Sequence, residues 1–267
     1  MAGTTRPVPL RSRVSALLPT ALRRPLRRTL DAAHAVGRSW RLRRALDELR
    51  VQARRGAVDQ ELVVRIREAW GNTSFSADAS FVSLVASRVI AGPGPFLECG
   101  SGLTTVVAGT IAQELGWRVW SLEQDRAWFE RMREHLARRG LLSVRLVLAP
   151  LREIDDFVWF DVRGLRLPPR LSCVWCDGPY VGRQEWPDPY FQNWRFGVVP
   201  VLQSLGIRFD ELLLDDAEVR RCKGVRERWW TLGVASEVVR TPTGALVRAA
   251  AADVRQGPGL TDDRPPG

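Results

Sequence analysis

Hydrophobic residues at helical spacing occupy the first third of the chain. They recur every three or four positions over 22–33, 42–49, 62–70 and 81–90. This spacing is typical of amphipathic helices, because it places the apolar side chains on one face. Gly56 interrupts the pattern after the second segment. We therefore predict four helical segments before the composition changes near residue 92.

From Phe96 onward, short apolar runs alternate with helical patterns, which is typical of a parallel sheet built from β-α units. The pattern predicts five β-α steps and a terminal hairpin around 242–244. One helix should run through 191–205, between the fourth and fifth strands, and a further helix is expected around 226–232. The predicted fold class is an α/β fold with a Rossmann-like, seven-stranded, mostly parallel sheet and an N-terminal helical extension. The expected strands are 96–98, 117–122, 144–148, 171–176, 211–214, 238–241 and 245–250.

The pattern divides the chain into four parts. We expect a basic helical arm at 1–56, a helical lead-in or lid at 57–94, the main domain at 95–250 and a disordered, Pro- and Gly-rich tail at 251–267. No apolar run approaches the roughly 20 residues of a membrane-spanning helix. The apolar stretch near Ala16 is too short for a secretory signal. We expect a cytoplasmic protein, with a cleaved transit segment as the alternative reading of the Arg-rich start.

The charge of the chain is concentrated at its N-terminus. The formal charge is +10, yet residues 1–56 hold fourteen arginines against three acids, and the remainder holds 26 basic and 27 acidic residues. A neutral body disfavours a nucleic-acid partner for the main domain. The arm could contact a membrane surface or an acidic partner. We favour the simpler interpretation, a helical arm packed on its own domain.

The four cysteines are too few and too scattered for a disulfide scaffold. Cys173 and Cys176 form a C-x-x-C pattern, but they lie in an expected strand. An odd separation in a strand points two side chains to opposite faces. We therefore interpret them as buried thiols rather than as a zinc or redox pair.

A glycine loop is the first candidate for chemistry. Gly100 and Gly102 follow the first strand and open a helix, so the backbone there can approach a ligand closely. Glu123, at the end of the second strand, stands where an acid would hold ribose hydroxyls. A dinucleotide cofactor is the obvious rival. Thr105 in place of a third glycine argues against it, as does Glu98, which would repel a pyrophosphate but could engage a positively charged amino group.

At this point the sequence resembles the class I S-adenosylmethionine-dependent methyltransferases, specifically the bacterial group with a catechol O-methyltransferase-like layout. The resemblance implies that 95–250 binds S-adenosylmethionine. Its methionine end would lie beside Glu98, Gly100, Ser101 and Gly102, its ribose at Glu123 and its adenine at Gln124. Thr104 and Asp177 would also line the cofactor site. The matching stretches are Leu97–Thr105 (LECGSGLTT), Val119–Asp125 (VWSLEQD), Cys176–Tyr180 (CDGPY) and Leu212–Ala217 (LLLDDA).

Three acids follow the fourth and fifth strands: Asp177, Asp215 and Asp216. Neighbouring strand ends would bring them together, and such a cluster requires a proton or a cation to relieve it. Oxygen ligands suit magnesium, calcium or manganese. In the catechol-type enzymes these positions hold a divalent metal, so the resemblance implies a magnesium-type site with Asp177 and Asp215 as catalytic residues. Tyr180 departs from the family, which often carries a histidine there. Alternatively, Asp177 lines the cofactor pocket, and Asp215 and Asp216 cap a helix.

The aromatic segment after the fourth strand supplies candidates for acceptor binding. We assign Tyr180 and Arg195 to the acceptor. Other aromatic and polar residues could cover it and exclude water, or could equally belong to the core; they are Trp70, Asn72, Trp159, Asp161, Tyr190 and Trp194.

The sequence thus favours a methyltransferase that methylates an oxygen of a small-molecule acceptor with the help of a metal ion. Two alternatives stay open. One is an RNA or DNA methyltransferase that uses the basic arm. The other is a non-catalytic domain that the arm tethers to a membrane or a partner. Neither the acceptor nor the oligomeric state follows from the sequence.

Overall fold

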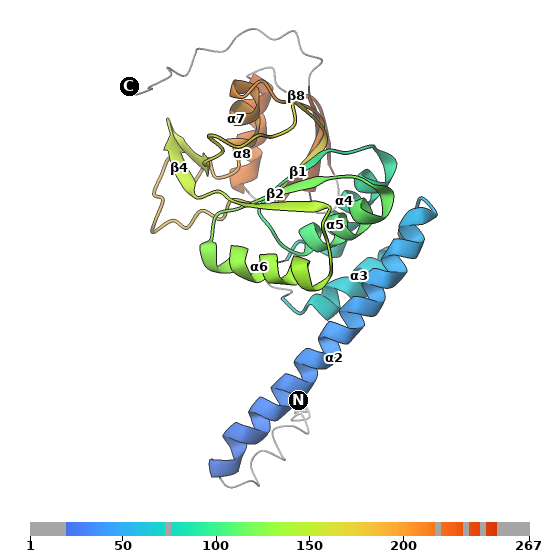
Figure 1. Cartoon of the computed structure of the whole chain (residues 1–267). Helices are drawn as coiled ribbons and strands as arrows, with labels where there is room; N and C mark the ends of the chain where they lie inside the picture. Colours follow the sequence, from blue (N-terminus) through green and yellow to red (C-terminus); the bar gives the residue numbers. More distant parts are fainter. Residues whose placement is uncertain (1–19, 73–75, 217–219, 232–234, 241–243, 250–267) are drawn as a thin grey trace, which may run out of the picture.

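The computed structural model describes residues 20–72, 76–216, 220–231, 235–240 and 244–249 (Figure 1). The main-sheet strands are β1 (Phe96–Cys99), β2 (Val119–Glu123), β3 (Val144–Leu148), β6 (Arg170–Cys176), β7 (Arg208–Asp215), β8 (Ala235–Arg240) and β9 (Gly244–Ala249). Their spatial order is β3-β2-β1-β6-β7-β9-β8. Pairs from β3 to β7 are parallel, whereas β9 is antiparallel to β7 and β8. The predicted Rossmann-like, seven-stranded α/β fold with its terminal hairpin is confirmed.

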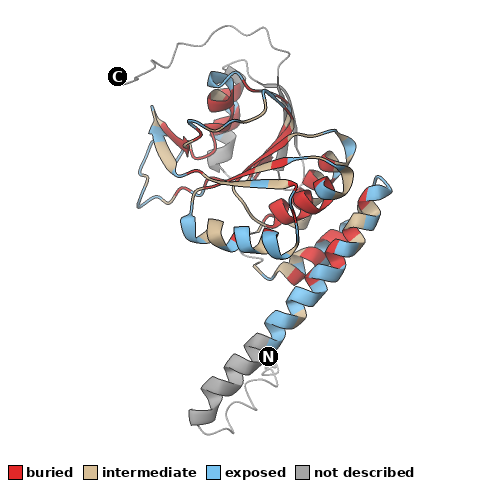
Figure 2. Ribbon diagram, viewed as in Figure 1, coloured by how far each residue is buried: buried red, intermediate tan, exposed pale blue. Residues whose placement is uncertain are grey.

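Helices cover both faces of this sheet, and each face has its own hydrophobic core (Figure 2). One face is covered by α2 (Thr20–Arg54), α3 (Gln60–Trp70), α4 (Ala79–Ala91), α5 (Leu103–Leu115) and α6 (Arg126–Arg138). The other packs against α7 (Val198–Ser204), α8 (Arg220–Thr231) and a two-stranded hairpin. Cys173 belongs to the first core and Cys176 to the second, so the predicted opposite orientation of the two thiols is confirmed.

The N-terminal region is one long helix where the sequence suggested two. Helix α2 has 35 residues, and its N-terminal half extends away from the domain (Figure 1). Its C-terminal half buries Leu42, Leu46, Leu49 and Ala53 in the helical core. This half is therefore part of the domain, and residue 56 does not mark an edge of the core. None of the described helices, α2 included, combines the length and the apolar content needed to cross a membrane.

A hairpin replaces the helix expected after the third strand. It consists of β4 (Leu151–Ile154) and β5 (Phe157–Phe160), paired antiparallel in a sheet of their own. The five expected β-α steps are wrong at this point. The segment has only short apolar runs, and the turn between them contains Asp155 in the left-handed region at φ 51°. A strand pair needs only such short runs, whereas a helix would need a longer periodic pattern.

Helix α7 is shorter than expected, because it begins at Val198 rather than near residue 191. Residues 188–197 instead form turns that bury Trp194 and Phe196. A Cβ at Gly197 would lie 2.8 Å from the ring of Trp159, so only glycine allows the chain to approach the core this closely. The predicted tail, 251–267, lies outside the described residues, as do residues 1–19 of the predicted arm.

Candidate functional site

The glycine loop joins β1 to α5 at the carboxyl edge of the sheet. Gly100 has φ +100°, a conformation that side chains disfavour. A Cβ on Gly100 would lie 2.7 Å from the backbone nitrogen of Gly178, in the loop after β6. The N–H of Gly178 donates to the carbonyl of Cys99 at 2.6 Å. The loops after β1 and β6 are thus in backbone contact, which places Asp177 beside the glycine loop.

Glu98 lies in a closed polar cluster within the core. Its partners in register on β2 and β6 are Ser121 and Trp175. One carboxylate oxygen accepts hydrogen bonds from the Thr104 hydroxyl (2.5 Å) and the Trp175 indole (2.8 Å). The other accepts from the hydroxyls of Thr105 and Ser121, both at 2.5 Å. All four donors belong to the protein, so Glu98 supports the glycine loop from within the core.

Thr105 connects this cluster to the loop. Its hydroxyl accepts a hydrogen bond from the Gly102 N–H at 2.8 Å while donating to Glu98. The residue that replaces a third glycine therefore has a structural role of its own. Burial raises the pKa of Glu98 to about 7, although the four donors act in the opposite direction.

Glu123 and Trp128 hold Ser101 from two sides. Glu123 is buried at the end of β2 and accepts from the N–H (3.2 Å) and the hydroxyl (2.5 Å) of Ser101. It also accepts from the N–H of Asp125 at 2.8 Å. The indole N–H of Trp128, in the first turn of α6, donates to the Ser101 carbonyl at 2.9 Å. Burial raises the pKa of Glu123, and its hydrogen bonds oppose that shift.

Gln124 bridges the loops after β2 and β6. Its side-chain amide donates to the carbonyl of Tyr180 at 2.8 Å and accepts from the N–H of Tyr180 at 2.9 Å. Strand β1 lies between β2 and β6, so the bridge spans the end of β1. The Tyr180 side chain is 70% exposed. It is therefore available at the surface beside the glycine loop.

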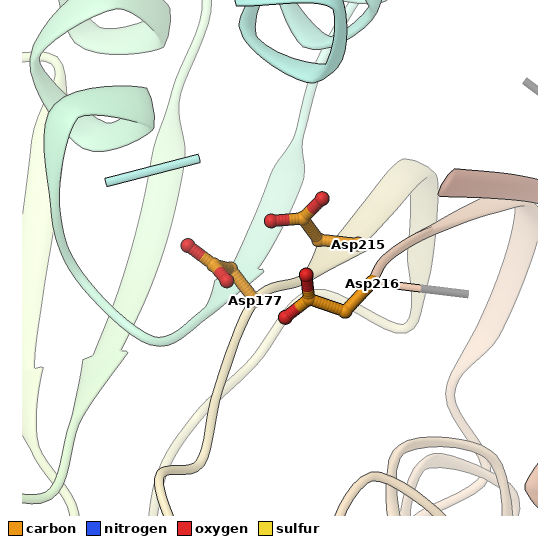
Figure 3. A group of neighbouring side chains, drawn as sticks. All are labelled: Asp177, Asp215 and Asp216. Carbon is orange, nitrogen blue, oxygen red and sulfur yellow. The ribbon is translucent and has the colours of Figure 1, made fainter. Parts of the chain in front are cut away.

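The three predicted acids do come together. Asp177 follows β6, Asp215 ends β7, and Asp216 is the next residue. One carboxylate oxygen from each lies within 4.8 Å of the others, and Figure 3 shows their side chains clustered across the two strand ends. Asp215 is buried, Asp177 partly buried and Asp216 exposed. The parallel register of β6 and β7 produces this juxtaposition.

Arg195 provides a positive charge inside the cluster. Its side chain is 2% exposed, and Nη2 lies 3.3 Å from Asp177 Oδ1 and 3.2 Å from Asp216 Oδ2. It also donates to the backbone carbonyls of Asp177 and Asp215. The sequence suggested Arg195 for acceptor binding, and the structure places it where it ties the two strand ends together.

The cluster has unusual proton affinity. Burial raises the pKa of Asp215 to about 8, and the charge of Asp177 acts in the same direction. Burial likewise raises the pKa of Asp177, while Arg195 lowers it. Three close carboxylates with one guanidinium thus favour the uptake of a proton or a cation.

The other candidates for covering the acceptor are dispersed. Trp159 and Trp194 belong to the core, and the Tyr190 hydroxyl donates to Glu153 of the hairpin. Asp161 pairs with Arg163. Trp70 and Asn72 line a pocket against α6.

Sequence reasoning missed Ser121, Trp175 and Trp128. The first two are in register with Glu98 on either side of β1. A polar or N–H-bearing residue at the matching position of each neighbouring strand is the signal that could have identified them. Trp128 reaches the glycine loop because Asp125 caps α6 at the end of β2.

A scan against protein-family models and a search of curated proteins find no match to this sequence. Among solved structures, the SAH-bound methyltransferase PaMTH1 of Podospora anserina aligns with a TM-score of 0.52 and 13% identity, over 93% of this chain and 100% of that chain. The N-terminal domain of human METTL16 in complex with SAH aligns at 0.47 and 13%, over 73% and 84%. The likeness to PaMTH1 shows that this chain has the fold of a methyltransferase.

Proposed function

We propose that the chain is an S-adenosylmethionine-dependent methyltransferase that methylates an oxygen of a small-molecule acceptor. The glycine loop carries the proposal. Gly100 and Gly102 lie at the carboxyl edge of a methyltransferase-type sheet, where open α/β folds bind ligands. A buried acid at the end of the next strand, Glu123, contacts the same loop.

In this proposal the cofactor lies across the ends of β1 and β2. Gly100, Ser101, Gly102 and Thr104 surround its methionine end, and Glu98 acts through Thr104 and Thr105 rather than at the surface of the site. Glu123 holds the ribose hydroxyls. One of its oxygens accepts both Ser101 donors and the other accepts the Asp125 N–H, so the carboxylate is held beside the glycine loop.

The remaining contacts lie on the loops to either side. Gln124 lies beside the adenine, on the bridge that it makes with Tyr180. Asp177 stands where the donor site and the acid cluster meet, because its N–H bonds to Cys99 at 3.1 Å and its carboxylate belongs to the cluster. Methyl donor and acceptor oxygen would meet there. Asp177 and Asp215 are the candidate proton acceptors, and the exposed ring of Tyr180 offers an apolar surface to the acceptor.

The acid cluster fits a divalent cation. Its three carboxylate oxygens are the hard ligands that magnesium, calcium and manganese prefer. Arg195 supplies one positive charge against the three acids. We include such a cation in the proposal, held by Asp177, Asp215 and Asp216. When bound, it would lower the pKa of an acceptor hydroxyl.

Calorimetric titration of the full chain with S-adenosylmethionine and with NAD, each with and without magnesium, tests the cofactor. We expect S-adenosylmethionine to bind and NAD not to bind. The variant Gly102→Ala sharpens the test, because its added methyl group meets no protein atom within 4 Å but would intrude on a cofactor.

Gly224→Ala is the matched control, since it too adds a methyl group to open space, on α8. We expect S-adenosylmethionine binding to weaken in Gly102→Ala and to persist in Gly224→Ala, with both variants folded. Binding of NAD without any response to S-adenosylmethionine would overturn the proposal.

The exposed arginines of α2 favour a second candidate, methyl transfer to a nucleic acid. Arg41, Arg43 and Arg44 are exposed on that helix. Phosphate contacts by such residues weaken as salt increases. Retention of RNA by the full chain at low salt, and its loss in the triple Arg→Ala variant, would favour this candidate over a small-molecule acceptor.

The same helix also keeps the tethering alternative open. Val36 and Trp40 are 70% and 57% exposed beside these arginines, and both types of residue favour the surface of an anionic membrane. Co-flotation of the full chain with anionic but not neutral vesicles, together with absence of S-adenosylmethionine binding, would support a tethered, non-catalytic domain.

A further inference from the structure

A pocket lies between α2, the end of α3 and α6, on the helical face of the sheet. Its volume is about 460 Å³, within the range of small-ligand sites. Arg38 of α2 reaches it by passing over Gly71, which ends α3. Arg131 and His135 contribute from α6 at a spacing of one helical turn.

The lining of this pocket is positively charged. Arg38, Arg131 and Arg139 line it, and no acidic residue is among the described residues of the lining. The acids Glu130 and Glu134 of α6 pair with other arginines of the same helix. The Nε–H of Arg139 is buried and has no hydrogen-bond partner in the described part of the chain. Arg139 Nη1 lies 3.0 Å from His135 Nδ1 and donates to the His135 carbonyl at 3.1 Å. An anionic group in the pocket would therefore meet the positive charge of the exposed Arg38 and Arg131.

The same lining presents aromatic rings. Trp70 and Trp128 are only partly buried, and the rings of Trp70 and His135 lie 5.2 Å apart. Guanidinium groups that contact phosphate, placed beside tryptophan rings on which a base can stack, are the combination that nucleotides require.

We propose that this pocket binds a nucleotide unit, with its phosphate at Arg38 and Arg131 and its base against the tryptophans. The inference goes beyond the proposed methyl transfer, and the binding does not depend on it. Trp128 also donates to the carbonyl of Ser101 in the glycine loop. Only the side chain of Trp128 would thus separate a molecule bound in the pocket from the cofactor site.

Calorimetry on the full chain tests the pocket with uridine monophosphate, uridine and inorganic phosphate. The uracil probe avoids the adenine site of the proposed cofactor. We expect uridine monophosphate to bind more tightly than either fragment. We expect Arg38→Ala and Arg131→Ala each to weaken that binding by about tenfold, through loss of a charge-assisted hydrogen bond.

Arg133→Ala is the matched control, because Arg133 lies on the same helix but pairs with Glu130 outside the pocket. All three arginines are exposed, so the variants should fold, which a thermal melt checks. Absence of uridine monophosphate binding to the wild-type chain would overturn the proposal, as would equal weakening by Arg131→Ala and Arg133→Ala.

A short oligouridylate distinguishes the two sources of such a unit. Binding tighter than that of the mononucleotide, and weakened by Arg38→Ala, assigns the pocket to a strand of nucleic acid. Binding no tighter than that of the mononucleotide assigns it to a free nucleotide. A failure of S-adenosylmethionine binding leaves either result standing, so the two proposals fail separately.

Discussion

Glu98 and the cluster of Asp177, Asp215 and Asp216 lie near the same edge of the sheet, and they differ in what compensates their charge. Glu98 receives four hydrogen bonds from neutral donors on α5, β2 and β6. Asp177, Asp215 and Asp216 face one another, and Arg195 contacts Asp177 and Asp216. Burial raises the pKa of Glu98, Asp177 and Asp215 alike. A raised pKa alone therefore does not identify a ligand site.

The hydrogen-bond and ion-pair partners of these carboxylates distinguish the role of Glu98 from that of the aspartate cluster. The oxygens of Glu98 are satisfied by the fold itself, so this group stabilises the glycine loop without needing a ligand. The aspartate cluster keeps an excess of negative charge, because one guanidinium stands against three acids. It is the cluster that would gain from binding a cation.

Arg195→Ala should have the largest effect. It removes the buried guanidinium that contacts the cluster and leaves the carbonyls of Asp177 and Asp215 without its donors. We expect the free energy of unfolding to fall by about 3–5 kcal/mol, measured by urea denaturation. Arg163→Ala is the control, since Arg163 pairs with Asp161 in solvent and should cost less than about 1 kcal/mol. Similar losses in the two variants would show that Arg195 does not compensate the cluster.

Glu98 should make the free energy of unfolding fall as the pH rises. This is the opposite of the dependence expected for an acid whose pKa is lowered on folding. Its pKa rises from 4.5 to about 7 on folding, so the folded state binds the extra proton between those values. Below about pH 4.5, the ionisation of Glu98 does not change the free energy of unfolding. As the pH rises, its ionisation lowers that free energy, by about 3 kcal/mol above pH 7.

The variant Glu98→Gln isolates this contribution, because it cannot ionise. The difference in unfolding free energy between wild type and Glu98→Gln should change by that amount between pH 4.5 and 7, whatever the other acids contribute. Glu68→Gln, at an exposed position of α3, should show no such change. A pH-independent difference for Glu98→Gln would mean that the four donors keep the carboxylate ionised.

Magnesium should stabilise the aspartate cluster and not the Glu98 cluster. At about thirtyfold above its dissociation constant it should add about 2 kcal/mol to the unfolding free energy. Asp216→Asn should lose this gain, and asparagine tolerates the left-handed φ of 51° at that position. Glu98→Gln should retain it. An equal gain in Asp216→Asn, or no gain at all in the wild type, would remove the metal from the proposed function.

The sequence was sufficient for the main sheet because each strand there is a distinct apolar run separated by helical periodicity. It was insufficient for β4 and β5, because charged residues interrupt the apolar positions of Leu151–Ile154 and no helical pattern separates the two strands. Their position depends on contacts with distant residues: the Asn193 side chain donates to the Asp156 carbonyl, and Arg228 pairs with Asp156. No local pattern encodes such contacts.

The candidate site, like the fold, was predictable only in part. Topology alone brings residues at the ends of neighbouring parallel strands together, which accounts for the clustering of Asp177, Asp215 and Asp216. The partners of Glu98 depend on the register between strands, which the sequence does not state. Arg195 lies in a segment that the sequence pattern predicted as helix and that forms turns instead, so the pattern did not indicate that its side chain turns inward.

Gln124→Ala should have the smallest effect on stability and the most selective effect on the site. It removes two hydrogen bonds to the backbone of Tyr180, at a cost of about 1 kcal/mol.

Gln113 offers a matched control, because its amide likewise bridges two backbone groups, the Gly140 carbonyl and the Ser143 N–H. Gln113→Ala should cost a similar amount in urea denaturation but leave S-adenosylmethionine binding unchanged, whereas Gln124→Ala should weaken it severalfold. Equal affinity in the two variants would place the adenine away from Gln124 and confine the role of that residue to joining the two loops.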